Sequence, residues 1–152
     1  GWEKRMRAAG LTTERIAEGD WSPASGQAAF RELLDRFPDL DAVFASNDQM
    51  AFGVLREANR RGLRVPDDLA VIGFDGIAEG EYMSPSLTTM AQPLATIGAT
   101  AVQRLLLEID GDPSVGPGVE LLVPTELIVR ESAPMPTSPP SAQLPSSSSV
   151  SS

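Results

Sequence analysis

The chain has 152 residues with 21 acidic and 12 basic side chains, a net charge of −9, and neither His nor Cys. This composition is typical of about one globular domain, and it excludes disulfides, thiolate or imidazole zinc sites, and catalytic nucleophiles that need His or Cys. The acidic balance argues against binding of a nucleic-acid backbone by this segment alone, and no apolar run is long enough to span a membrane or to form a signal peptide. Because the sequence starts at Gly1 within a helix-like pattern, we expect a fragment or a processed product.

The first 40 residues or so predict a helix, a short strand and a second helix. A helix over residues 2–9 should end at Gly10, because glycine tolerates a left-handed C-cap. Residues 15–18 are a short strand candidate. Ser22 and Pro23 then supply an N-cap and a first helical residue, and apolar side chains at helical spacing continue this helix up to the next proline.

The middle of the chain predicts a strand, a helix and another strand. Residues 42–45 and 69–74 are compact apolar runs suited to buried parallel strands. Between them, Asn47 or Asp48 caps a helix that ends at Gly62, and cap preference favours Asp48. The inner face of this helix is predicted to be Ala51, Val54, Leu55 and Ala58. This alternation of strand and helix periods predicts an α/β fold, a doubly wound parallel sheet with right-handed crossovers.

The remaining ordered elements follow a loop over residues 76–85. They are an extended segment at 87–90, an amphipathic helix opened by Pro93 and running to residue 109, and two short strands at 119–123 and 127–129. Residues 132–152 carry no charge, and 14 of these 21 residues are Ser or Pro. Such a segment cannot bury enough apolar surface to offset its ordering entropy, so we predict a disordered tail after a domain over residues 1–131.

Polar or aromatic residues follow three predicted strands at the point where each strand ends: Trp21, Asn47 and Asp75. The carboxyl ends of strands form the ligand-binding edge of a doubly wound sheet, so these side chains should converge although they are 26 and 28 residues apart. A carboxylate accepts two hydroxyl hydrogen bonds, an Asn donates and accepts, and an indole stacks on the C–H patches of a sugar. The set suits a neutral polyhydroxylated ligand better than a phosphate, because no Lys or Arg accompanies it.

Each of these residues also has a plain structural interpretation. Asn47 or Asp48 would serve only as a helix cap. Asp75 would be an ordinary turn residue, and Trp21 would be a core or interface anchor. Only their joint placement at one edge favours a ligand site.

Three blocks of the sequence carry a resemblance to a known family: residues 42–54 (AVFASNDQMAFGV), 62–75 (GLRVPDDLAVIGFD) and 87–93 (LTTMAQP). In this order and spacing they closely resemble the effector-binding core of LacI/GalR-type transcriptional regulators. The resemblance covers residues 1–131 and not the Ser/Pro-rich tail.

The resemblance implies a type I periplasmic-binding-protein-like fold of two α/β lobes, of which this chain holds mostly the C-terminal lobe. A sugar or similar small effector would bind between the lobes and change, by allostery, the affinity of an N-terminal helix-turn-helix for operator DNA. By resemblance, Trp21 stacks on the effector, Asn47 bonds its hydroxyls, Asp75 clamps them, and Gln92 lies at a crossover near the cleft. No catalytic residue, cofactor or metal is implied.

By the same resemblance, the DNA-binding headpiece and nearly all of the first lobe would precede Gly1, so we expect no DNA-binding residue in this chain. Residues 93–121 would belong to that first lobe. A cytoplasmic homodimer is expected, with the helix at 47–62 and the loop at 82–85 near the subunit interface. The alternatives are the sugar-binding protein of an ABC-type transporter, which the block at 62–69 disfavours, and an enzyme, which would need an acid/base pair or a phosphate loop.

Overall fold

A four-stranded sheet with the strand order β1-β2-β3-β4 is the centre of the structure. The computed structural model describes residues 1–116 and 120–135. The strands are β1 (Ala42–Phe44), β2 (Ala70–Asp75), β3 (Thr88–Ala91) and β4 (Glu126–Ile128). β1, β2 and β3 pair in parallel, which confirms the predicted α/β class, whereas β4 runs antiparallel to β3 and makes the sheet mixed.

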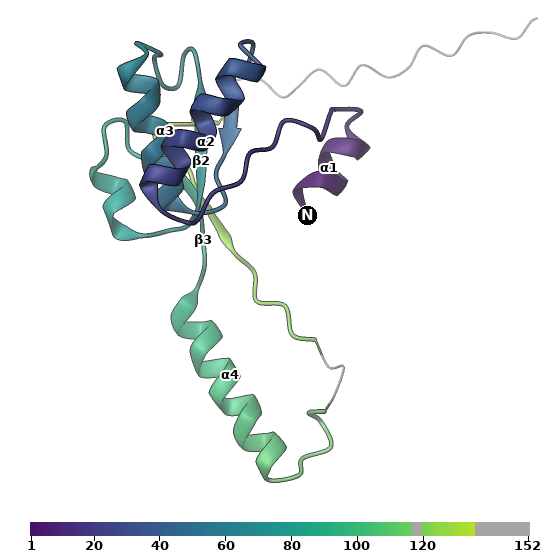
Figure 1. Ribbon diagram of the computed structural model, residues 1–152. Coiled ribbons are helices and arrows are strands. Elements are labelled where there is room, and N and C mark those ends of the chain that lie inside the picture. Colours follow the sequence, from purple (N-terminus) through teal and green to yellow (C-terminus); the bar gives the residue numbers. More distant parts are fainter. Residues whose placement is uncertain (117–119, 136–152) are drawn as a thin grey trace, which may run out of the picture.

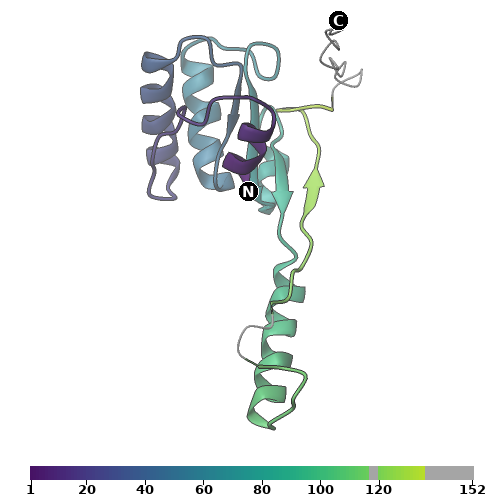
Figure 2. The same ribbon diagram turned by 90° about the vertical axis from the view of Figure 1, so that its right-hand side faces the viewer.

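Helices α2 and α3 pack side by side, and α3 packs on β2 of the sheet (Figures 1 and 2). We call these two helices and the sheet the lobe. The helices of the described residues are α1 (Trp2–Ala8), α2 (Pro23–Arg36), α3 (Asp48–Arg60) and α4 (Leu94–Ile109), with a 3-10 helix at Ala78–Tyr82. All four predicted helices are therefore present, and Gly10 and Gly62 follow α1 and α3 with positive φ as expected.

The N-caps of the two lobe helices fix where they start. Ser22 caps α2, and its Oγ accepts a hydrogen bond of 3.1 Å from the Ser25 backbone N–H. Asn47 caps α3, and its Oδ1 accepts one of 2.8 Å from the Met50 backbone N–H. The preference for Asp48 as the cap is thus wrong, because the Asp48 side chain turns into the lobe and bonds elsewhere.

The hydrophobic core lies between α2, α3 and the sheet. The predicted inner face of α3, from Ala51 to Ala58, is buried there together with Phe30 of α2. Its other buried members come from the strands and their flanks: Ala45, Leu69, Val71 and Leu87. Burying such side chains supplies the main driving force for folding the lobe.

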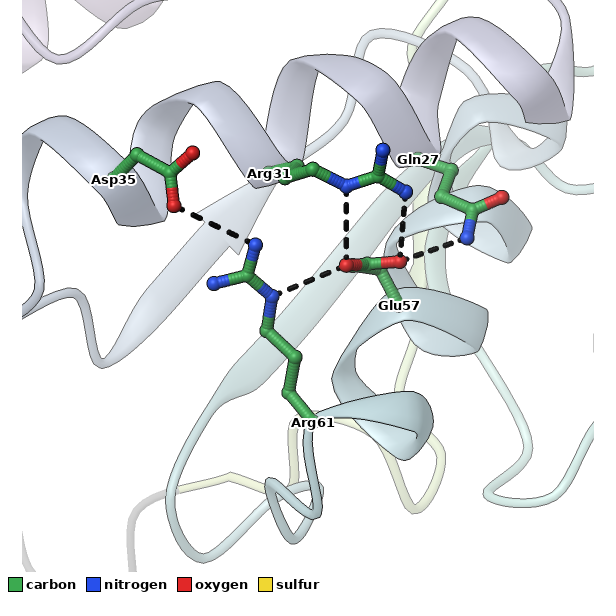
Figure 3. Close-up of polar contacts among 5 residues, drawn as sticks. All are labelled: Gln27, Arg31, Asp35, Glu57 and Arg61. Carbon is green, nitrogen blue, oxygen red and sulfur yellow. Dashed lines mark hydrogen bonds and ion pairs between the residues drawn. The ribbon is translucent and has the colours of Figure 1, made fainter.

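A buried carboxylate also joins the two lobe helices (Figure 3). Glu57 of α3 is 4% exposed, and it accepts hydrogen bonds from Gln27 Nε2 at 2.7 Å and from Arg61 Nε at 3.1 Å. Arg31 of α2 donates two more hydrogen bonds to this carboxylate, from Nε to Oε1 and from Nη2 to Oε2, both at 3.3 Å. Arg61 lies 3.5 Å from Asp35 as well. The hydrogen bonds from Arg31, Gln27 and Arg61 lower the pKa of Glu57 to about 2.

This shift makes the helix pairing sensitive to acid. The folded-state pKa of Glu57 lies below its ordinary value of 4.5, so its contribution is complete above that value and is lost as the pH falls towards about 2. We expect Glu57→Gln to lower the melting temperature at neutral pH and to differ less from the wild type at about pH 3. Thermal melts across this range check it, with Glu32→Gln in an exposed i,i+4 pair as the control. A constant difference at every pH would contradict this role of Glu57.

Two predicted strands are wrong. Residues 15–18 form no strand, and Ile16 is half exposed, so β1 is left as the outer strand of the described sheet. Contrary to the predicted burial of this segment, no residue of β1 is buried and Phe44 is 46% exposed. Residues 120–123 are also not in a strand, while residue 119 lies outside the described residues.

Ser132, near the end of the described residues, is hydrogen-bonded to two strands of the sheet, β2 and β3. Ser132 is fully buried, its Oγ donates to the Val71 carbonyl at 2.6 Å, and the same oxygen accepts from the Thr88 N–H at 2.9 Å. The tail predicted from residue 132 onward therefore cannot include Ser132. Residues 136–152 of that prediction lie outside the described residues.

Helix α4 projects away from the lobe at the ends of β3 and β4 (Figures 1 and 2). None of its residues is buried. Its predicted apolar stripe has no core to face among the described residues, and the exposed members include Leu94, Val102, Leu105 and Ile109. Among all the residues that the structure describes, every helix is too short or too polar to cross a lipid bilayer.

Candidate functional site

Trp21 lies in the turn that leads into α2, with its indole at the surface. Its side chain is 65% exposed and its backbone has a φ of 71°, in the left-handed region that a bulky side chain rarely adopts. The Trp21 carbonyl accepts a hydrogen bond of 3.0 Å from Asn47 Nδ2. Two residues of the predicted site, 26 positions apart, are thereby joined.

The residues on either side of Trp21 hold this turn in shape. Asp20 Oδ1 accepts hydrogen bonds from the Ser22 N–H at 3.1 Å and from the Ser22 hydroxyl. Its own N–H donates to Ser25 Oγ at 3.0 Å. The hydrogen bonds from Ser22 and Ser25 keep the pKa of Asp20 below its ordinary value. The exposed indole is therefore displayed by a turn with its own hydrogen-bond network.

Asp75 ends β2 at the same edge. Its Oδ1 accepts a hydrogen bond of 2.7 Å from Gln92 Nε2, and the Gln92 N–H donates to the Asp75 carbonyl at 3.1 Å. Asp75 is half-buried and has a φ of 113°. These bonds bring together the other two residues of the predicted site. The carboxylate keeps lone pairs for a further donor.

Trp21 and Asp75 are the two residues other than glycine with positive φ in the part of the chain that the structure describes. Such conformations cost about 1–3 kcal/mol each and persist where neighbouring contacts impose them. They are concentrated at ligand-binding and catalytic sites. Both strained residues are ones that the sequence places at the ligand edge, which links the strain to that edge.

Asn47 combines a structural role with its predicted position at the site. It is 8% exposed, and both polar atoms of its side chain already have a partner. Nδ2 donates to the Trp21 carbonyl, and Oδ1 accepts from the Met50 N–H. One amide hydrogen and one oxygen lone pair remain for a ligand. Its part in positioning Trp21 is thus directly visible, while its contact with a ligand stays a prediction.

Asp48 is the residue of this region whose role the sequence does not reveal. It is fully buried, and its carboxylate accepts from the Gly76 and Ile77 N–H groups, each at 2.9 Å, and from Thr89 Oγ1 at 2.6 Å. A Cβ on Gly73 would lie 2.1 Å from Asp48 Oδ1, so only glycine fits there. The sole signal in the sequence is an acidic residue at the start of the helix that follows a strand.

The edge is open rather than enclosed. A depression of about 450 Å³ is lined by Gln92 and by residues where β3 and β4 leave the lobe, but it does not reach Trp21, Asn47 or Asp75. Among residues 1–116 and 120–135, no group of three or more His, Cys, Asp or Glu is placed to hold a metal ion. These side chains can stack on a ligand through the indole and can form hydrogen bonds with it through one carboxylate and two amides.

Comparison with known proteins assigns the chain to a family. Residues 1–133 match the family model of the periplasmic binding protein-like domain. The HTH-type transcriptional regulator CelR of Thermobifida fusca is 40% identical over 134 residues, which are 87% of this chain and 39% of that protein. The chain therefore spans about two fifths of the length of such curated relatives.

Solved structures agree with the sequence matches. A transcriptional regulator CelR–cellobiose complex has a TM-score of 0.79 and 39% identity, covering 87% of this chain and 40% of that chain. A lac repressor dimer bound to operator and the anti-inducer ONPF has a TM-score of 0.82 and 33% identity, covering 88% and 46% respectively. These relatives are regulators, which favours the regulator interpretation over that of a transporter's sugar-binding protein or an enzyme.

Proposed function

The chain belongs to the LacI family of transcriptional regulators, as part of its effector-binding region, and on this premise we propose that its lobe binds one side of a small neutral sugar. Trp21 would stack on the sugar ring, Asp75 would accept hydrogen bonds from hydroxyl groups, and Asn47 and Gln92 would complete the contacts. Binding would change the affinity of a helix-turn-helix domain of the intact protein for operator DNA.

One observation carries this proposal: the two strained residues, Trp21 and Asp75, lie at the carboxyl-terminal edge of the lobe. An exposed indole together with carboxylate and amide groups suits a polyhydroxylated neutral ligand. In a doubly wound sheet this edge is where ligands bind.

The other lobe, called the first lobe in the sequence analysis and the second lobe from here on, would close the site from the opposite side. The absence of any buried residue in α4, and its position beyond the ends of β3 and β4, support the proposal that residues 93–121 pack in that second lobe. The apolar stripe of α4 would then be covered, as exposed stripes of this kind require. The sugar would lie between the lobes and favour one of their relative arrangements.

We also propose a homodimer that works in the cytoplasm, where operator DNA is. A depression of about 380 Å³ between the end of α3 and the loop at residues 84–85 is lined by Leu55, Asn59, Leu63 and Pro85. Nearby Tyr82 is 82% exposed. Large exposed aromatic side chains beside apolar depressions are typical of subunit contacts.

The role of Asp75 gives a direct test. Asp75→Asn keeps an acceptor for Gln92 and a residue type that tolerates positive φ, but it removes the charge. We expect the affinity of the intact protein for its sugar to fall about tenfold, because hydrogen bonds to charged groups are the stronger ones. Calorimetric titration with a panel of neutral mono- and disaccharides, cellobiose included, measures this.

The matched control for that titration is Asp67→Asn. It removes an exposed carboxylate that pairs with Arg64 before the start of β2, at the opposite end of that strand from Asp75. It should bind as the wild type does. If no saccharide binds the wild-type protein, the sugar proposal is wrong. If both variants bind equally well, Asp75 does not contact the ligand.

A further inference from the structure

We propose that Asp48 is a positioning residue for the ligand-binding edge, because its buried carboxylate holds the backbone that presents Asp75. This inference rests on the proposed function, in which Asp75 contacts the ligand. Asp48 itself is fully buried and lies behind that edge, so it acts through Asp75 and does not touch the ligand.

Both oxygens of the Asp48 carboxylate are used. Oδ2 accepts from the backbone N–H groups of Gly76 and Ile77, each at 2.9 Å, and these are the two residues that directly follow Asp75. Oδ1 accepts from Thr89 Oγ1 on β3 at 2.6 Å. The side chain thus joins the start of α3 to the end of β2 and to the strand that leads to Gln92.

Close packing also restricts the backbone on both sides of Asp75. A Cβ at Gly73 would meet Oδ1 at 2.1 Å. A Cβ at Gly76, where φ is 77°, would lie 2.5 Å from Ala91 Cβ. Asp75 lies between these two glycines with a φ of 113°, so the contacts around it impose the strained conformation that aims its side chain at the edge.

Glu57 shows that burial of a carboxylate in this lobe does not by itself serve the edge. It is buried like Asp48 and also has charge-assisted partners, but these come from α2 and from the end of α3. Among the described residues, the hydrogen-bond partners of Glu57 lie neither in the turn with Trp21, nor at the end of β2, nor beside Gln92. Asp48 therefore has a positioning role, whereas Glu57 only stabilises the pairing of α2 and α3.

The first measurement is amide hydrogen exchange in the intact protein without ligand. Asp48→Asn removes the negative charge, and a neutral acceptor forms weaker hydrogen bonds, so we expect the amide hydrogens of Gly76 and Ile77 to exchange about tenfold faster relative to those of β1 and β2. Thr89→Val removes only the donor to Oδ1 and should leave the protection of these two amides in place. Unchanged protection in Asp48→Asn would overturn the proposal, whatever the ligand is.

A second variant covers the case in which Asp48→Asn does not fold. Ile77 has a φ of −69°, which proline adopts, so Ile77→Pro deletes one donor to Asp48 from the other side of the contact. Ile77→Ala keeps that N–H and is its control. We expect faster exchange at Gly76 in the proline variant alone, and equal exchange in the two variants would overturn the proposal.

Fluorescence titration of the intact protein with cellobiose adds the functional readout. Asp48→Asn should bind about tenfold more weakly, whereas Glu57→Gln should bind as the wild type does although it also lowers the melting temperature. Normal cellobiose affinity in Asp48→Asn would overturn the positioning role. If the wild type does not bind cellobiose, the proposal of this sugar as ligand fails, and the exchange measurement alone decides the role of Asp48.

Discussion

Gly53→Ala should destabilise the lobe by about 3 kcal/mol, which is a large part of the stability of a small domain. Helices α2 and α3 approach each other at Gly53, where an added Cβ would lie 1.9 Å from the Pro23 carbonyl oxygen and 2.6 Å from the Gln27 nitrogen. Both of these are backbone atoms, so no side-chain rotation relieves the clash. The helices would have to separate and expose the core around Phe30.

The same helix crossing also leaves no room for a side chain at Gly26. At Gly26 an added Cβ would lie 2.2 Å from the Met50 carbonyl oxygen, so Gly26→Ala should behave as Gly53→Ala does. Gly98→Ala is the control, because nothing lies within 4 Å of its added Cβ in α4 and alanine favours helix over glycine. Urea or thermal unfolding followed by circular dichroism measures all three. A wild-type melting temperature for Gly53→Ala would contradict this close crossing of the helices.

Local signals in the sequence were sufficient for the helices and for much of the core. The proline after Ser22 and the glycine at position 62 mark helix ends, and the spacing of Ala51, Val54 and their neighbours gives the buried face of α3. These features depend on residues within a few positions of one another. They are therefore readable without knowing which segments meet in the fold.

Features that depend on distant partners were missed or misjudged. The strand expected at residues 15–18 has suitable residues but no ladder in the described structure, because a strand exists only through its neighbour. Asp48 looked like a cap, since its true partners lie 28 to 41 positions away. Ser132 looked like tail, and its partner Val71 is 61 positions away.

The candidate site shows both situations. Asn47 and Asp75 could be placed at one edge because parallel strands share a carboxyl end. The strand expected before Trp21 is absent, and Gln92 was expected from the family resemblance alone, yet the structure joins Trp21 to Asn47 and Asp75 to Gln92. The positive φ of Trp21 and of Asp75 could not be expected, because neither residue type predicts it. Those two conformations follow from contacts with Asn47 and around Asp48, which are tertiary.

Trp21→Ala should abolish most of the sugar response of the intact protein while operator binding is kept. Loss of a stacking indole at the centre of a contact costs about 2 kcal/mol or more, which is about thirtyfold in affinity. The indole is 65% exposed in this structure, so its removal should leave the melting temperature nearly unchanged. Sugar titration and operator binding in the presence and absence of sugar measure the two effects separately.

Two further substitutions at position 21 separate stacking from backbone strain. Trp21→Phe keeps an aromatic face and should retain part of the sugar affinity. Trp21→Gly removes the ring but suits the φ of 71°, so it should raise the melting temperature slightly above that of Trp21→Ala and still lose the sugar response. If Trp21 were instead a structural anchor, alanine and glycine would both lower the melting temperature and operator binding would fall together with the sugar response. A retained melting temperature in Trp21→Ala together with a lost sugar response would link the exposed, strained Trp21 to ligand binding rather than to folding of the lobe.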